Sequence, residues 1–109
     1  MKREIVTHNA LEGFHAWPGA PAECEYLRAR HRHIFVIRTR LEVSHNEREI
    51  EINLQGMAIK TALEARFGSP CEFGAMSCES IAELILNTFP AATRCEVLED
   101  GYAGASLSR

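Results

Sequence analysis

Hydrophobic and polar positions alternate over a long stretch in the first half of the chain. Successive side chains of a β-strand leave opposite faces of the sheet, so such alternation predicts a strand with one buried face. The stretch covers residues 31–43, where one set of positions is largely apolar and the other largely charged. The first set is His31, His33, Phe35, Ile37, Thr39, Leu41 and Val43, and the second is Arg32, Ile34, Val36, Arg38, Arg40 and Glu42.

Shorter segments carry weaker strand signals. Residues 2–11 predict a first strand, followed by a loop rich in glycine and proline that runs to about residue 28. Residues 48–54 alternate again after a polar turn, which predicts an antiparallel hairpin with the long strand. Residues 93–99 alternate before Asp100 and predict the last long strand.

Helical spacing of apolar residues appears in two segments. Residues 55–67 have this spacing and end at Gly68, a residue typical of helix C-termini. Residues 78–89 follow Ser77, a typical N-cap, and a proline stops the pattern. The sequence therefore predicts an α+β fold with the order β-β-β-α-α-β. Its sheet would be antiparallel and four-stranded, with both helices packed on one face.

Composition limits the classes of protein that fit. The 109 residues, 46% hydrophobic and 25% charged, fit one globular domain spanning 1–109. The net charge of -3 and the scattered arginines argue against a nucleic-acid module. Because no apolar stretch has the length of a signal peptide or a membrane span, we expect a soluble, cytoplasmic protein without a membrane partner.

Cysteine usage gives no metal or redox motif. The four cysteines lie far apart without a C-x-x-C pair, which argues against both a zinc knuckle and a thioredoxin-like site. We expect Cys78 and Cys95 to be small buried residues on their elements.

Histidines supply the candidate chemistry. His31 and His33 are two apart on the predicted strand, so both imidazoles leave the same face and can reach one ion. His15, in the loop that enters this strand, could supply a third nitrogen and leave a fourth position open, as catalytic zinc requires. The alternative is that these histidines are hydrogen-bonded residues facing the core.

The order of motifs resembles the T-fold family that holds 6-pyruvoyltetrahydropterin synthase and 6-carboxytetrahydropterin synthase. The family pattern runs F-x-A-A-H, C-x-x-L-H-G-H, P-T-x-E and a late glutamate. The corresponding residues here are Leu11-Glu12-Gly13-Phe14-His15, Cys24-Glu25-Tyr26-Leu27 with His31-Arg32-His33, Met76-Ser77-Cys78-Glu79, and Val97-Leu98-Glu99.

The resemblance implies a role for each matched residue. His15, His31 and His33 would bind Zn²⁺, and Glu99 would anchor a pterin ring through a charge-assisted fork. Cys24 would be the thiolate that moves a proton beside the metal. Two alternatives stay open: Glu99 as a solvated residue at the end of a strand, and Cys24 as an unreactive loop thiol displaced by three extra residues before His31.

Arginines near the histidines are candidates for binding a substrate triphosphate, since Arg binds phosphate oxygens in pairs. Arg28 and Arg30 are the main candidates, with Arg32 beside them. The alternative is that Arg32, Arg38 and Arg40 line the outer face of the strand and pair with glutamates.

The family's Asp-His pair, which polarises the cysteine chemistry, is missing. Asp100 is the one aspartate in the chain, and no histidine follows His45. The leading expectation is a zinc-dependent lyase acting on 7,8-dihydroneopterin triphosphate or a related pterin, on a queuosine-type route to 7-deazapurines. The alternatives are a T-fold protein that binds zinc and a pterin or purine without turnover, and a purely structural oligomer. The resemblance also implies a homo-oligomer, either a trimer-based ring or a hexamer.

Overall fold

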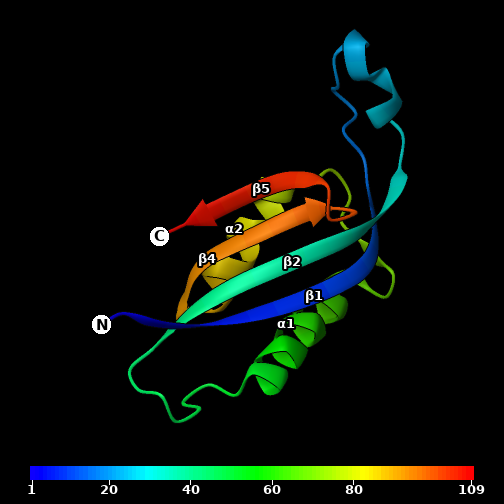
Figure 1. The fold of residues 1–109 in the computed structure, drawn as a ribbon. Coiled ribbons are helices and arrows are strands. Elements are labelled where there is room, and N and C mark those ends of the chain that lie inside the picture. The colour runs from blue at the N-terminus through cyan, green and yellow to red at the C-terminus, as the bar shows by residue number, and fades with distance from the viewer.

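A mixed sheet of five strands in the order β3-β1-β2-β4-β5 carries the fold (Figure 1). The computed structural model describes residues 1–109. The strands are β1 (Arg3–His15), β2 (His31–Val43), β3 (Cys71–Glu72), β4 (Ala92–Glu99) and β5 (Ala103–Ser108). The helices are α1 (Ile52–Phe67), α2 (Cys78–Thr88) and the short 3₁₀ helix η1 (Ala22–Leu27). The predicted α+β class is confirmed, as is the long strand over residues 31–43.

The predicted four-stranded antiparallel sheet is wrong. Strand β2 pairs antiparallel with both β1 and β4, and β4 pairs antiparallel with β5. Strand β3 adds a short parallel pairing at Gly13 and Phe14 of β1. The residues after Asp100, which the predicted order β-β-β-α-α-β leaves outside the sheet, form β5.

The hairpin predicted for residues 48–54 is also wrong. Both edges of β2 are already occupied by β1 and β4, so no edge is left for another strand. Ile52 and Leu54, two of the apolar residues in that alternation, are exposed and belong to the first turn of α1. Glu51 caps this helix by accepting a hydrogen bond from the backbone of Asn53. The local alternation thus gave the wrong structure because capping and sheet topology outweigh it.

Both α-helices cover the same face of the sheet (Figure 1), as predicted. Ile59 and Leu63 of α1 and Ile81 and Ile85 of α2 join one core with the inward residues of β2, such as Phe35. Ser77 caps α2 as predicted, since its Oγ accepts from the backbone N–H of Ser80 at 3.1 Å. Cys78 and Cys95 are buried in this core, and all four cysteines are free thiols.

The link between β1 and β2 projects away from the sheet (Figure 1) and contains η1. We call residues 16–30 the projecting arm. Strand β1 extends to His15, so this histidine is the last residue of a strand and not part of a loop as predicted. No helix of the protein combines the length and the apolar character that crossing a bilayer requires.

Candidate metal centre

Four side chains meet at one end of the sheet, on the face that the helices cover: His15, His31, His33 and Glu99. The strand register explains the meeting. His15 of β1 lies opposite His31 of β2, and Glu99 of β4 lies opposite Phe35. Residues directly opposite each other, and residues two apart along a strand, share a face. The ligand atoms of the four residues all lie within 4.8 Å of one another.

Aromatic residues form the floor of this cluster. Phe35 is fully buried, and its ring centroid lies 5.1 Å from that of His15 and 5.7 Å from that of His33. Phe73 packs against Phe35 with the centroids 4.9 Å apart. Gly13, opposite His33, makes room for both phenyl rings, because a Cβ there would lie 2.8 Å from Phe73 and 3.0 Å from Phe35. The imidazoles therefore rest on the packed core and not on a mobile loop.

Each imidazole is oriented by a partner of its Nδ1 atom. The Nδ1 of His15 lies 2.9 Å from the carbonyl oxygen of Met76, and that of His31 lies 2.9 Å from the carbonyl of Ala29. The Nδ1 of His33 lies 2.8 Å from a carboxylate oxygen of Asp100. All three partners only accept hydrogen bonds, so these contacts favour the tautomer in which Nδ1 carries the proton and Nε2 presents a lone pair. Histidines that bind a metal through Nε2 usually donate a hydrogen bond from Nδ1 to a carbonyl or carboxylate oxygen in this way.

The Nε2 atoms of the cluster lack hydrogen-bond donors from the protein. The Nε2 atoms of His15 and His33 both lie 2.9 Å from Oε2 of Glu99. The contact of His33 lacks hydrogen-bond geometry, and the buried Nε2 atoms of His31 and His33 have no hydrogen-bond partner. A neutral imidazole has a single N–H, which its Nδ1 already uses. A cation among these atoms would satisfy all of them.

The cluster fits a metal ion. Imidazole nitrogen and carboxylate oxygen are donors that zinc takes at about 2.0–2.2 Å in a tetrahedral site, which places neighbouring ligand atoms about 3.3 Å apart. The four groups here, all within 4.8 Å, need only a small contraction to reach that spacing. The predicted ligands His15, His31 and His33 are thus brought together, and Glu99, predicted to hold a ring, lies among them.

A pocket of about 450 Å³ opens beside the cluster. His15, His31 and Glu99 form one wall, and the remaining lining includes Trp17 and Leu27 of the projecting arm, Met76, and the first turn of α2. Its volume is within the usual range for small-molecule sites, which combine apolar walls with a few polar groups.

Cys78 also lines this pocket. Burial, with help from the negative charges of Glu99 and Glu79, raises the pKa of this thiol to about 12. The thiol therefore keeps its proton at neutral pH and is not a nucleophile in this state.

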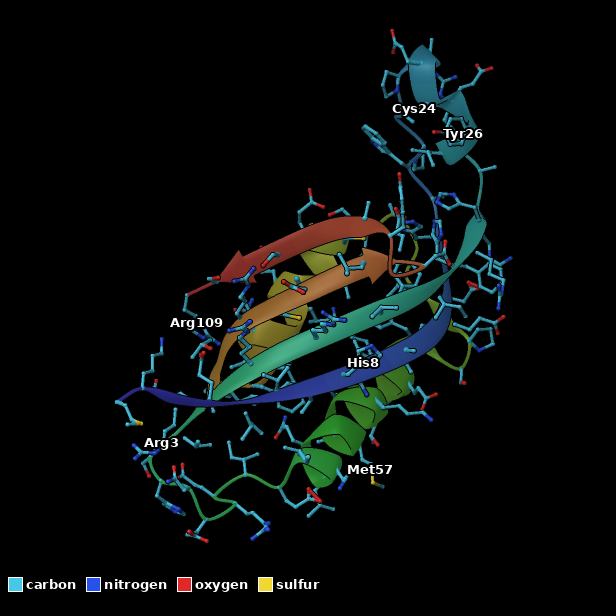
Figure 2. The ribbon with its side chains drawn as sticks, viewed as in Figure 1. Arg3, His8, Cys24, Tyr26, Met57 and Arg109 are labelled. Carbon is cyan, nitrogen blue, oxygen red and sulfur yellow. The ribbon has the colours of Figure 1, made fainter.

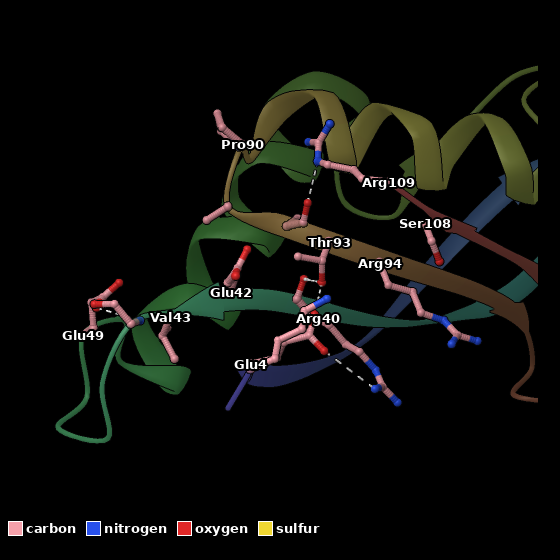
Figure 3. A pocket seen from close by; sticks show the side chains of 14 residues that line it. Glu4, Arg40, Glu42, Val43, Glu49, Pro90, Thr93, Arg94, Ser108 and Arg109 are labelled. Carbon is pink, nitrogen blue, oxygen red and sulfur yellow. Dashed lines mark hydrogen bonds and ion pairs between the residues drawn. The ribbon is translucent and has the colours of Figure 1, made fainter.

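A larger hollow, about 700 Å³, lies at the opposite end of β1 and β2 (Figure 3). Glu4 accepts a hydrogen bond from Thr93 and lies 4.0 Å from Arg40, while Arg109 donates to the carbonyl of Ala92. The hollow contains no histidine or cysteine, so size alone does not make it the better candidate for chemistry.

Cys24 lies apart from the pocket. It belongs to η1, and Figure 2 places it with Tyr26 on the outer part of the projecting arm. It does not line the pocket beside the histidines. Residues 28–30, the insertion noted in the sequence, continue from η1 to the start of β2.

The arginines proposed to bind phosphate are engaged elsewhere. Arg30 forms an ion pair with Glu72 and stacks 3.6 Å above the ring of Phe14. Arg28 donates to the carbonyl of Ala20 at 2.7 Å. Arg32 pairs with Glu12 across the β1–β2 pairing, which is the alternative that the sequence left open.

Sequence reasoning assigned no role to Asp100. Its carboxylate accepts from the backbone N–H of Ile34 and from His33, and these hydrogen bonds hold the pKa of Asp100 below its ordinary value. The local signal was present, because an Asp-Gly turn directly follows Glu99. The missing information was that β4 pairs with β2, which brings this turn beside His33.

A comparison of the sequence with protein-family models gives no match, and a comparison with curated proteins also gives none.

Proposed function

We propose that this protein is a zinc-dependent lyase of the 6-carboxytetrahydropterin synthase type, acting on 7,8-dihydroneopterin triphosphate or a related pterin. The observation that carries the proposal is the convergence of three imidazoles and the carboxylate of Glu99, whose ligand atoms lie within 4.8 Å of one another, beside a pocket of about 450 Å³. Support also comes from the order of the motifs in the sequence, which matches the family from His15 to Glu99.

Zinc is the proposed ion because three imidazoles and one carboxylate are a ligand set that suits it. The Nδ1 contacts of the three imidazoles are also those that zinc-binding histidines make. Bound there, zinc would supply a Lewis acid that polarises the oxygens of a substrate side chain. His15, His31 and His33 would hold it. Glu99 would complete the site or turn toward the ring of the substrate, and its half-exposed carboxylate has room for either role.

The remaining roles follow the resemblance. Cys24 would move protons, and Arg28 and Arg30 would bind phosphate, once the projecting arm and its ion pairs rearrange around a substrate. The T-fold assignment and a homo-oligomer belong to the same proposal. The outer edge of β5 and most of that of β1 have no partner strand, and pairing with a second copy would cover them.

A second function has its own support: binding of zinc and a pterin or purine without turnover. Cys24 does not line the metal pocket, and Cys78, the cysteine that does, is protonated at neutral pH. The sequence also lacks the family's Asp-His pair. Loss of such groups can lower a rate by orders of magnitude while leaving binding intact.

The metal is tested first. Elemental analysis of purified protein should find about one zinc per chain, and His31→Ala should lose most of it, because the remaining ligands hold a metal poorly. His8→Ala is the matched control, since His8 is an exposed residue of β1 outside the cluster. Unchanged zinc in His31→Ala would refute the proposed centre.

Turnover is tested next, with the zinc-loaded protein and 7,8-dihydroneopterin triphosphate. Product formation that is lost in Cys24→Ala supports the lyase. If no product forms but pterin binds, and binding weakens in Glu99→Gln, the binding protein is supported. Absence of both turnover and binding would contradict both functions.

A further inference from the structure

We propose that Asp100 is a positioning residue of the metal centre, whose carboxylate fixes the ring and the tautomer of His33. This inference rests on the proposed metal site and assigns a role to a residue outside its ligand set.

The carboxylate of Asp100 is held at both oxygens. Oδ1 accepts from the backbone N–H of Ile34 at 2.9 Å, and Oδ2 lies 2.8 Å from Nδ1 of His33. The backbone N–H of Asp100 donates back to the carbonyl of Ile34 at 2.7 Å. The carboxylate is therefore clamped to the backbone of β2, directly beside the histidine that it orients.

The contact of His33 differs from those of the other two histidines. The Nδ1 atoms of His15 and His31 meet neutral carbonyl oxygens, whereas that of His33 meets a full negative charge. Hydrogen bonds to ionised acceptors are stronger than neutral ones, and a carboxylate on Nδ1 makes Nε2 a better donor to a metal. Asp100 therefore holds the imidazole of His33 in its orientation more strongly than the carbonyl oxygens hold those of His15 and His31.

The turn between β4 and β5 supplies the site with a candidate ligand and with a residue that orients another ligand. Glu99, at the end of β4, reaches the centre, and Asp100, the next residue, holds His33 from behind. Asp100 has a φ of 56°, a left-handed conformation that aspartate and asparagine tolerate better than most residues. If Asp100 served only to form the turn, its left-handed conformation would be explained. Its carboxylate would then have no need to contact Nδ1 of His33.

Asp100→Asn separates the two roles. Asparagine suits the left-handed conformation, and its single oxygen can still accept from Ile34. Its amide NH₂ would then face Nδ1 of His33 and favour the tautomer with the proton on Nε2, which blocks the ligand atom. Glu96→Gln is the matched control, because it removes a charge from β4 at a residue that pairs with Arg94.

The test is a titration of the full metal-free chain with Zn²⁺ and Co²⁺ in competition with a chelator. We expect Asp100→Asn to bind about 10–100-fold more weakly, as for other partners of metal-bound histidines, and its Co²⁺ absorption spectrum to change. Glu96→Gln should match wild type in affinity and spectrum. Urea unfolding without metal measures separately the stability that Asp100→Asn loses with the charged hydrogen bond to His33.

Wild-type affinity and spectrum in Asp100→Asn would overturn the inference while leaving the metal centre intact. Failure of wild type to bind either ion would overturn the proposed centre and this inference with it. Should Asp100→Asn fail to fold, ¹⁵N spectra of the imidazoles in zinc-loaded wild type decide. We expect a protonated Nδ1 in His33, and a metal-bound Nδ1 there would overturn the role of Asp100.

Discussion

Gly13 is a position where a single added methyl group should disturb the floor of the candidate metal centre. It lies on β1 opposite His33, and an alanine Cβ there would meet Phe73 at 2.8 Å and Phe35 at 3.0 Å. Carbon atoms pack best at about 3.5–4.0 Å, so the rings would have to retreat by about 0.5 Å or more. Phe35 is 0% exposed and Phe73 is 3% exposed, which leaves them little space to move.

The expected cost follows from the packing. Inserting a methyl group into a filled core costs about 1–3 kcal/mol. Replacing glycine also restricts the unfolded chain, which returns about 0.4–1 kcal/mol. Because a contact of 2.8 Å lies well inside the usual spacing, the cost should fall in the upper half of its range, about 2–3 kcal/mol. We therefore expect Gly13→Ala to lower the free energy of unfolding by about 1–2.6 kcal/mol, and to lower Tm by about 4–8 °C for each kcal/mol.

Gly56→Ala is the control, because a Cβ at Gly56 in α1 meets nothing within 4 Å. Alanine is favoured over glycine in a helix by about 1 kcal/mol, so this variant should be more stable than wild type. Urea unfolding of the three proteins, followed by far-UV circular dichroism, measures both changes. If Gly13→Ala were as stable as wild type, the two rings could not be packed as described, and the floor of the metal centre would be misassigned.

Three further predictions concern α2 and the buried thiols. Ser77→Ala should lower the free energy of unfolding by about 1 kcal/mol through loss of the N-cap, whereas Ser80→Ala, which keeps the backbone donor, should change it less; equal stabilities in urea would contradict the cap. Cys78 and Cys95, with pKa values raised by burial to about 12 and about 11, should resist a thiol reagent at neutral pH in the folded protein and react in urea. Because the unfolded thiols lose their protons near the ordinary value of 9.0, stability should fall as the pH rises above it; a flat profile from pH 8 to 10.5 in urea unfolding would contradict this.

The parts of the fold that were predictable have strong local patterns. Residues 31–43 alternate over their whole length, and the face they bury contains Phe35, Ile37 and Leu41. The second helix has both a cap at Ser77 and an apolar stripe. In these segments, periodicity and local chemistry predict the same structure, and the structure agrees.

The parts that were not predictable depend on neighbours distant in sequence. Strand β5 consists mostly of small residues, and only Ala105 and Leu107 are partly buried against the core. It is a strand because β4 offers it an edge, and Gly104 permits a close approach there: a Cβ would lie 1.8 Å from the carbonyl oxygen of Val97. Segment 48–54 shows the opposite case, in which alternation was present but the long strand had no free edge.

The candidate site divides in the same way. His31 and His33 were predictable as neighbours from their spacing on one strand. His15 was predicted to join them from a loop before that strand and from the motif order, although its place at the end of a strand was missed. The contribution of Asp100 depends on the pairing of β2 with β4, which no local pattern encodes.

The groups of the candidate metal centre are spread widely along the chain, and this has a consequence for how the protein folds. His15 and Glu99 touch although 84 residues separate them. An ion bound to both would close that long loop, and the entropy lost on closing a loop grows with its length. During synthesis, His15, His31 and His33 would leave the ribosome well before Glu99. An ion could bind tightly only after β1 and β4 had come together. Tight binding of the ion would therefore mark a late step of folding.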